Sequence, residues 1–390
     1  MSMMQITINK KINLLMKKLA IYIHIPFCDH KCIYCDFYSI IKMDNVSGFI
    51  ESIKNEISSY DSMMNEMEIT SIFFGGGTPS LLDPKAIAEI LNQFTKKYHL
   101  ASNCEITLET NPGTVGLQKL KDFKNIGINR LSIGVQSFND LELKFLTRIH
   151  DKQLAIKTVE DGANAGFKNI SLDLIFSLPK QTREIWKSNL NIATELPITH
   201  ISAYSLILER GTILNKMVLD GKVKMQESDY DASLYEYTIR YLAEKNFIQY
   251  EVSNFTKKGY ESIHNLSYWE HDNYIGFGPS AHSFVDDKRW WNFSGVKQYI
   301  DKIKKNGNAL RGEEILTKEE LLNEYVMLAL RSKGLDLYLL NKIHGSEWIS
   351  RNKDYINELI NNNYLIKSDN FIKFTAKGYL LCDEILLKFK

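Results

Sequence analysis

The feature that most limits the fold of this chain is a regular alternation of apolar, β-branched runs with longer amphipathic stretches between residues 19 and about 210. Such an alternation is typical of βα units, in which crossover helices join parallel strands. We expect six strands, at 19–26, 69–75, 105–110, 130–136, 169–178 and 200–206, separated by helices that include 84–98 and 152–165. Right-handed crossovers would curl these strands into an α/β fold, a partial (β/α)6 barrel resembling part of a TIM barrel.

The pattern changes after residue 210. A helix is expected at 228–245, and the Tyr-, Trp-, Gly- and His-rich segment 250–292 is interpreted as ordered loop with short strands. From residue 317 onward we expect a helix through 331, shorter helices, two short strands at 364–367 and 371–374, and a final helix. Helices followed by a hairpin resemble a winged helix. Its 11 Lys and Arg against 10 Asp and Glu lack the basic excess of a nucleic-acid-binding domain, so a packing or docking module is favoured.

These patterns predict four divisions of the chain. They are an N-terminal extension at 1–17, where Met16 looks like an alternative start, a core barrel at 18–215, an extension at 216–310 and a mostly helical, winged-helix-like domain at 311–390.

Composition excludes several protein classes. The 48 Lys and Arg nearly balance the 47 Asp and Glu, which argues against a chain-wide surface for nucleic acid. Hydrophobic residues make up 44% and charged residues 24%, which are ordinary values for a globular protein. No run approaches the roughly 20 apolar residues of a membrane-spanning helix, and targeting signals are weak, so we expect a cytoplasmic protein.

Three of the five cysteines lie within eight residues, directly after the first expected strand. Barrel active sites are built at this carboxyl end of the strands. The spacing of Cys28, Cys32 and Cys35 is too short for a disulfide framework, so it favours metal or cluster ligation. Three thiolates can hold three irons of a cubane cluster and leave the fourth open, whereas the competing interpretation is a structural zinc site with His24 or His30 as its fourth ligand.

Glycine and polar residues stand at the carboxyl ends of the other expected strands. The glycines of 75–77 remove every side chain from the end of the second strand, which suits either a close approach of another group or a tight turn. Glu109 ends the third strand, Gln136 ends the fourth and is followed by Arg148, and Asp173 lies within the fifth. We expect these side chains to meet a ligand at the same rim as the cysteines.

The cysteine spacing and the glycine triplet together resemble the radical S-adenosylmethionine (SAM) superfamily. The stretches 22–28 (YIHIPFC), 75–80 (GGGTPS), 109–112 (ETNP), 134–138 (GVQSF) and 173–179 (DLIFSLP) look like its porphyrin-related branch, which contains HemN and HemW. The resemblance covers roughly residues 18–390. It implies a [4Fe-4S] cluster on the three cysteines, with SAM chelating the open iron. The matching positions imply a SAM pocket of Tyr22, Tyr34, Gly76, Gly77, Thr78, Glu109, Gln136, Arg148 and Asp173.

One position separates the two members of this branch. The HemN-like coproporphyrinogen oxidases have a fourth cysteine two residues after the third, where this chain has Phe37, so the resemblance favours HemW. The stretch 264–269 (HNLSYW) resembles a HemW motif associated with haem binding. It implies His264 as a haem ligand, with Tyr268 and Trp269 beside the macrocycle.

The resemblance therefore implies a haem chaperone that binds haem and passes it to haem-accepting proteins, such as respiratory enzymes. It also allows dimerisation on haem loading and peripheral membrane association, and it leaves productive SAM cleavage open. Two alternatives remain. One is an oxygen-independent coproporphyrinogen III oxidase of porphyrin biosynthesis, and the other is a radical SAM enzyme acting on a different substrate.

Overall fold

The computed structural model describes residues 16–390. Most of the expected N-terminal extension, residues 1–15, lies outside the described residues. The last residue of that extension, Lys17, already belongs to the first strand.

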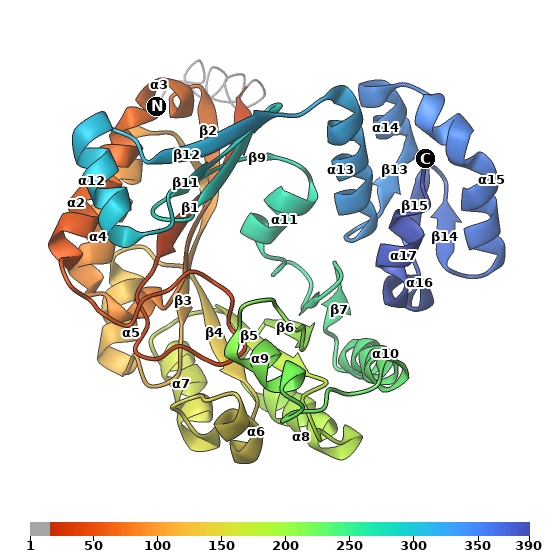
Figure 1. The fold of residues 1–390 in the computed structure, drawn as a ribbon, viewed down its shortest axis with the longest axis horizontal. Coiled ribbons are helices and arrows are strands. Elements are labelled where there is room, and N and C mark those ends of the chain that lie inside the picture. The colour runs from red at the N-terminus through yellow and green to blue at the C-terminus, as the bar shows by residue number, and fades with distance from the viewer. Residues whose placement is uncertain (1–15) are drawn as a thin grey trace, which may run out of the picture.

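A curved sheet of twelve strands forms the framework (Figure 1), in the order β12-β11-β10-β9-β1-β2-β3-β4-β5-β6-β8-β7. Its six central strands are parallel and confirm the six expected ones: β1 (Lys17–Ile25), β2 (Met67–Gly76), β3 (Leu100–Thr110), β4 (Arg130–Gln136), β5 (Asn169–Phe176) and β6 (His200–Ser205). The expected partial barrel is confirmed, and all six strands end at one rim.

Six further strands continue the sheet on both sides. Beyond β6 lie the antiparallel β8 (Asn254–Thr256) and β7 (Ile248–Gln249). Beyond β1 lie the parallel β9 (Asn273–Phe277) and the antiparallel β10 (His282–Val285), β11 (Lys288–Asn292) and β12 (Leu310–Ile315). The expected boundary at 310/311 thus falls at the start of a strand of the same sheet.

Helices cover the convex face of the sheet (Figure 1). They are α2 (Val46–Ser59), α3 (Asp61–Met64), the 3-10 turn η1 (Pro79–Leu81), α4 (Pro84–Lys97), α5 (Leu117–Asn125), α6 (Asp140–Phe145), α7 (Lys152–Asn164) and α8 (Arg183–Glu195), with α12 (Val296–Asn306) beside α2. In α4, Asp83 caps the first turn, and Ile87, Ile90, Leu91 and Phe94 recur at helical spacing and are buried. Within residues 16–390, no helix combines the length and the hydropathy needed to cross a bilayer.

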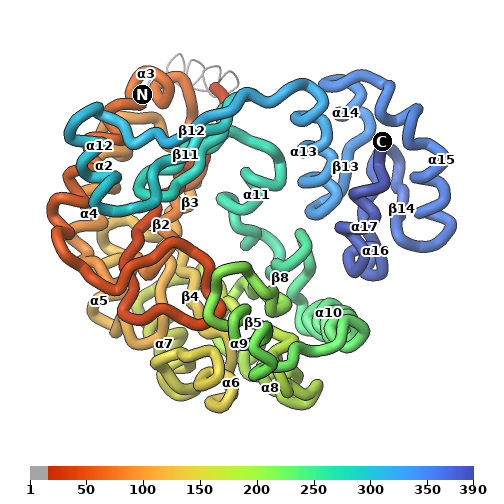
Figure 2. Tube along the Cα trace, in the orientation of Figure 1, coloured from red at the N-terminus to blue at the C-terminus, as the bar shows by residue number. Residues whose placement is uncertain are grey.

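Three helices follow β6: α9 (Ile213–Leu219), α10 (Ser228–Glu244) and α11 (Ile263–Trp269). The helix expected at 228–245 is confirmed as α10. The segment 250–292 was expected to hold only loop and short strands, so α11 corrects that expectation. A helix of seven residues leaves little periodicity in a sequence, and α11 depends on contacts with β1, β2 and β9. It lies on the concave side of the sheet (Figure 2).

The C-terminal region has its own buried core. It contains α13 (Lys318–Leu330), β13 (Leu335–Asp336), α14 (Leu337–His344), α15 (Glu347–Asn361), β14 (Leu365–Ser368), β15 (Phe371–Phe374), α16 (Ala376–Leu380) and α17 (Cys382–Leu386). The expected hairpin is β14–β15, and β13 adds a third strand to it. This mostly helical unit with a small sheet confirms the winged-helix-like expectation, although the final helix is divided into α16 and α17.

A buried carboxylate joins the added strands to α2. Glu56 is 1% exposed and accepts hydrogen bonds from the Gly278 amide (2.9 Å), the Asn292 Nδ2 (2.6 Å) and the Tyr299 hydroxyl (2.6 Å). Burial raises the pKa of Glu56 from 4.5 to about 7, even though these donors act against the rise. This contact fastens the last turn of α2 to the end of β9, to β11 and to α12.

The raised pKa of Glu56 predicts a pH-dependent contribution to stability. The folded chain holds the proton of Glu56 more tightly than the unfolded chain, so this contribution to the free energy of unfolding falls as the pH rises from about 4.5 to about 7. We expect Glu56→Gln to remove that slope. The stability difference between wild type and variant should then change by roughly 2–3 kcal/mol between about pH 5 and pH 8 in urea unfolding of the cluster-free protein. Glu51→Gln, at an exposed position of α2, is the control; parallel profiles for wild type and Glu56→Gln would contradict the prediction.

Candidate functional site

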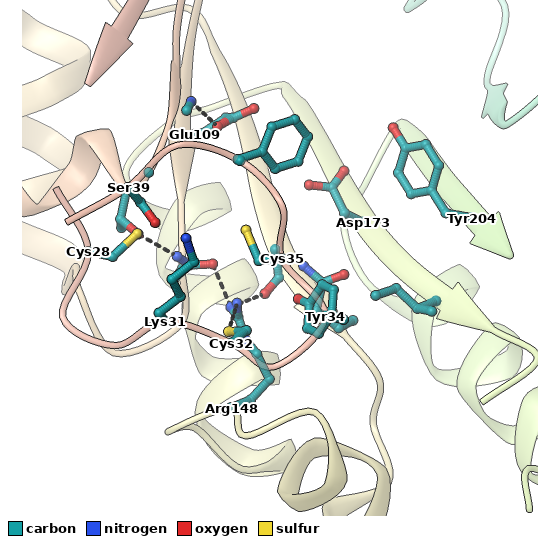
Figure 3. A pocket seen from close by; sticks show the side chains of 18 of the residues that line it. Cys28, Lys31, Cys32, Tyr34, Cys35, Ser39, Glu109, Arg148, Asp173 and Tyr204 are labelled. Carbon is teal, nitrogen blue, oxygen red and sulfur yellow. Dashed lines mark hydrogen bonds between the residues drawn. The ribbon is translucent and has the colours of Figure 1, made fainter. Parts of the chain in front are cut away.

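The carboxyl ends of the parallel strands surround a cavity of about 420 Å³. Most of the side chains expected at the SAM pocket line it, together with the three cysteines: Cys28, Cys32, Tyr34, Cys35, Gly76, Gly77, Thr78, Glu109, Gln136, Arg148 and Asp173. Figure 3 shows the cysteine loop on one side of this cavity and Asp173 with Tyr204 on the opposite side. Residues separated by up to about 145 positions in the sequence are thus brought together because all six strands run in one direction.

The cysteine loop leaves β1 and returns beside it. Phe27 and Ile40 form an isolated parallel bridge, and the Cys28 amide donates to the Ile40 carbonyl at 3.0 Å. The Cys28 Sγ lies 3.5 Å from the Thr78 Oγ1, and the Arg148 Nη1 lies 3.6 Å from the Cys32 Sγ. All three cysteines are free and half-buried. Their sulfurs are therefore available to a group bound in the cavity.

The arrangement of the thiols fits a multi-iron cluster. Within the described part of the chain, no three Cys, His, Asp or Glu side chains gather closely enough to hold a single metal ion. A cubane offers a separate iron to each thiolate, so its ligands need not converge on one point. Burial raises the pKa of Cys28 and raises that of Cys35 to about 11. The positive iron ions would displace these protons on binding, as metals do at thiolate sites.

The glycines at the end of β2 allow a side chain and a backbone carbonyl from β1 and the cysteine loop to approach closely. A Cβ on Gly76, which has a φ of 107°, would lie 2.5 Å from the His24 ring, and a Cβ on Gly77 would lie 2.6 Å from the Phe27 carbonyl oxygen. The group that approaches this backbone is therefore the chain's own β1 and cysteine loop. The Gly76 amide still faces the cavity and donates to the Glu109 Oε2 at 3.1 Å.

Two carboxyl groups give the cavity an acidic side. Burial, and then the nearby Asp173, raise the pKa of Glu109 to about 8. Burial also raises the pKa of Asp173, although the Ser132 hydroxyl donates to its carboxylate at 3.3 Å. Two carboxylates that share a poorly solvated space repel each other, and a positively charged group bound between them relieves that repulsion. This acidic side suits the ammonium and sulfonium groups of SAM.

Arg148 connects β4 with the cysteine loop. Its Nη2 donates to the Gly134 carbonyl at 2.6 Å and to the Asn111 side chain, and Asn111 in turn donates to the Thr78 Oγ1 at 2.8 Å. A Cβ on Gly134 would lie 2.7 Å from the Asn111 Oδ1, so only glycine leaves room for this arrangement. Sequence reasoning named Arg148 but missed Asn111, although Asn111 lies within the stretch 109–112 and directly follows the end of β3.

Backbone strain accompanies Gln136. It has a φ of 68°, in the left-handed region, and the pairing of β4 with β5 is irregular between Gly134 and Gln136. A bulge with left-handed backbone at a strand end redirects the side chain, here into the cavity.

The outer part of the cavity is apolar. It is lined by Phe37, Ile175, Tyr204, Leu206 and Ile207, of which Phe37 is 64% exposed and Ile207 is 67% exposed. Sequence reasoning did not assign the last three to a site. Their position at the carboxyl end of β6 is the signal that could have identified them, because that end faces the same rim.

Tyr22 lies outside the cavity lining. It belongs to β1, and its hydroxyl lies 3.1 Å from the His24 Nδ1, whose ring also contacts the Tyr38 carbonyl through Nε2 at 2.9 Å. Tyr22 is three residues before the end of β1 and is therefore deeper in the barrel than the rim. With both of its ring nitrogens engaged, His24 does not fit the fourth ligand of a zinc site.

The three residues of the expected haem site lie at α11, away from the cysteine cavity. His264 is 2% exposed, its Nδ1 lies 2.9 Å from the Ser71 Oγ, and its Nε2 lies 3.0 Å from the Tyr268 hydroxyl. The ring also stacks on Phe73, with 4.8 Å between ring centroids. Trp269 ends the helix and is half-buried. With both nitrogens engaged and no access from solvent, His264 does not fit an axial haem ligand in this conformation.

Comparison with known proteins extends these observations. Residues 22–191 match the Radical SAM superfamily. The "Heme chaperone HemW" of Bacillus subtilis (strain 168) is 33% identical over 367 residues, which are 93% of this chain and 97% of that protein. "Radical S-adenosyl methionine domain-containing protein 1, mitochondrial" of Danio rerio is 35% identical over 384 residues, 94% of this chain and 86% of that protein.

The fold also has a solved counterpart. Coproporphyrinogen III oxidase (HemN) from Escherichia coli, a radical SAM enzyme, superimposes with a TM-score of 0.82 over 98% of this chain and 93% of that chain, at 22% sequence identity. At that identity the similarity establishes a shared fold. The nearly complete coverage of HemW sequences, together with the superfamily match, shows that the chain belongs to the HemW family of radical SAM proteins.

Proposed function

We propose that this chain is a haem chaperone that carries a [4Fe-4S] cluster and SAM, binds haem and delivers it to haem-accepting proteins, respiratory enzymes among them. The observation that carries the proposal is the length-wide similarity to HemW proteins. Phe37 supports it, because an exposed phenyl group stands at the cavity where a coproporphyrinogen oxidase would have a fourth cysteine. A cytoplasmic location, a dimer on haem loading and contact with a membrane surface stay predictions.

Different residues of the cavity would bind the cluster and SAM. Cys28, Cys32 and Cys35 would hold the cluster, which supplies one-electron chemistry and an open iron for SAM. Glu109 and Asp173 would face the positive charges of SAM, and Arg148 holds the rim in position through the Gly134 carbonyl. The apolar outer wall leaves few hydrogen-bonding groups for water beside the cluster.

The first prediction concerns the cluster. After anaerobic reconstitution, wild type should bind about four irons per chain, and Cys32→Ala should lose most of this iron together with the charge-transfer absorption of the cluster. Cys104→Ala is the control, because Cys104 is a buried residue of β3 and does not line the cavity. Equal iron content in Cys32→Ala and wild type would contradict the assignment.

The second prediction concerns SAM. Replacing Glu109 by Gln should weaken SAM binding by about 10- to 100-fold, the usual effect of losing a charged hydrogen-bond partner. Because the pKa of Glu109 is raised to about 8, the wild-type affinity should increase from about pH 6 to pH 9 as the carboxyl group ionises. In calorimetric titrations, the affinity of Glu109→Gln should depend on pH less than that of wild type over that range, because the carboxyl group of Asp173 still faces the ligand. Glu89→Gln, at an exposed position of α4, should match wild type.

The third prediction separates the chaperone from the oxidase. The reconstituted protein should bind haem stoichiometrically and form no decarboxylated product from coproporphyrinogen III in the presence of SAM and a reductant. His264→Ala should weaken haem binding by about tenfold or more, whereas His99→Ala, at an exposed histidine, should not. Sustained formation of protoporphyrinogen would instead establish the oxidase activity.

A further inference from the structure

The position of His264 disagrees with the role that the proposed function gives it. Its side chain is 2% exposed and its two ring nitrogens contact Ser71 and Tyr268. An axial ligand needs one free ring nitrogen and room for a flat macrocycle beside it. Neither is present while α11 occupies the position seen here, which we term the closed position.

A single carboxylate holds the first turn of α11 in the closed position. Glu105 of β3 accepts hydrogen bonds from the Ser262 hydroxyl (3.3 Å), the Ile263 amide (3.2 Å) and the His264 amide (3.1 Å). It is 4% exposed. A carboxylate at this end of a helix satisfies amide groups that have no partner within the helix. The carboxylate belongs to the barrel and not to the helix, so it fastens α11 to the sheet.

A buried arginine lies behind this carboxylate. The Arg130 Nε of β4 lies 3.8 Å from the Glu105 Oε2, and Arg130 is 2% exposed. This Nε has no hydrogen-bond partner among the described residues. Burial is the main cause that lowers the pKa of His264, and the positive charge of Arg130 lowers it further. The histidine in the closed position is therefore neutral, with a lone pair that is covered by its two partners.

We infer that Glu105 is a positioning residue for haem binding: it holds α11 in the closed position, and His264 becomes available to haem iron only when α11 leaves the concave face of the sheet. This inference rests on the proposed function, because it takes His264 as the haem ligand. If only a fraction of the molecules has α11 released, the apparent haem affinity is reduced by that fraction. A chain with a weaker Glu105 contact thus binds haem more tightly, which is the opposite of what a general loss of structure produces.

The test compares the full-length, reconstituted protein with Glu105→Gln and Ser71→Ala. Glu105→Gln removes the charge that fastens the helix, and Ser71→Ala removes only the partner of the His264 Nδ1, so it serves if the first variant fails to fold. Hydrogen exchange should become at least about tenfold faster at the α11 amides in Glu105→Gln, with exchange in α4 unchanged. Haem titration should show tighter binding by both variants. Glu142→Gln, at a buried carboxylate of α6 that is 7% exposed, is the matched control.

Two sets of results would overturn the inference. Unchanged exchange at α11 in Glu105→Gln would show that Glu105 does not hold the helix, and equal or weaker haem binding by both folded variants would show that the closed position does not limit access. If His264→Ala binds haem as well as wild type does, the proposed ligand itself is wrong. The hydrogen exchange of α11 in Glu105→Gln separates that failure from a failure of the Glu105 contact, because it is measured without haem.

Discussion

Two backbone hydrogen bonds between the end of β2 and the beginning of the cysteine loop determine where the cavity forms. The Gly77 amide donates to the Ile25 carbonyl at 2.8 Å, and the Thr78 amide donates to the Phe27 carbonyl at 2.7 Å. A side chain at position 77 would occupy the place of the second carbonyl, so these contacts require glycine. They hold Cys28 beside Thr78 and turn the loop across the ends of the strands. Together with the contact of Arg148 with Cys32, they set the position of the thiols relative to the carboxyl groups of β3 and β5.

The sequence allowed the central fold and most of the cavity to be predicted, for one physical reason. Parallel strands joined by crossover helices place all their carboxyl ends at one rim, so a residue's position at a strand end is enough to locate it. Glu109, Gln136 and Asp173 followed from this rule. Asn111 and Tyr204 obey the same rule, but an amide and a phenol attract less attention in a sequence than a carboxylate does.

The family resemblance names the residues that the function uses, but it does not say where the fold places their side chains. The resemblance assigned Tyr22 to the SAM pocket. In the structure, the Tyr22 hydroxyl contacts the His24 ring below the rim. The resemblance also assigned His264 to a haem site. In the structure, His264 lies on α11, whose first turn contacts Glu105, a residue 159 positions earlier in the sequence. No local sequence pattern predicts a contact between such distant segments. A motif records which residues a function needs in any of its states, and one structure shows a single state.

The sheet is open, so it ends in two edge strands whose backbone groups could pair with another chain. One edge, β7, is only two residues long. The other, β12, is almost fully exposed, but Glu313 and Glu314 extend from it and form ion pairs with Lys288 and Arg289 of β11. Short strands and charged side chains oppose the addition of a further strand at an edge. Both ends of the sheet are therefore protected against β-ladder pairing with a second copy of this chain, so the extent of the sheet is set within one chain.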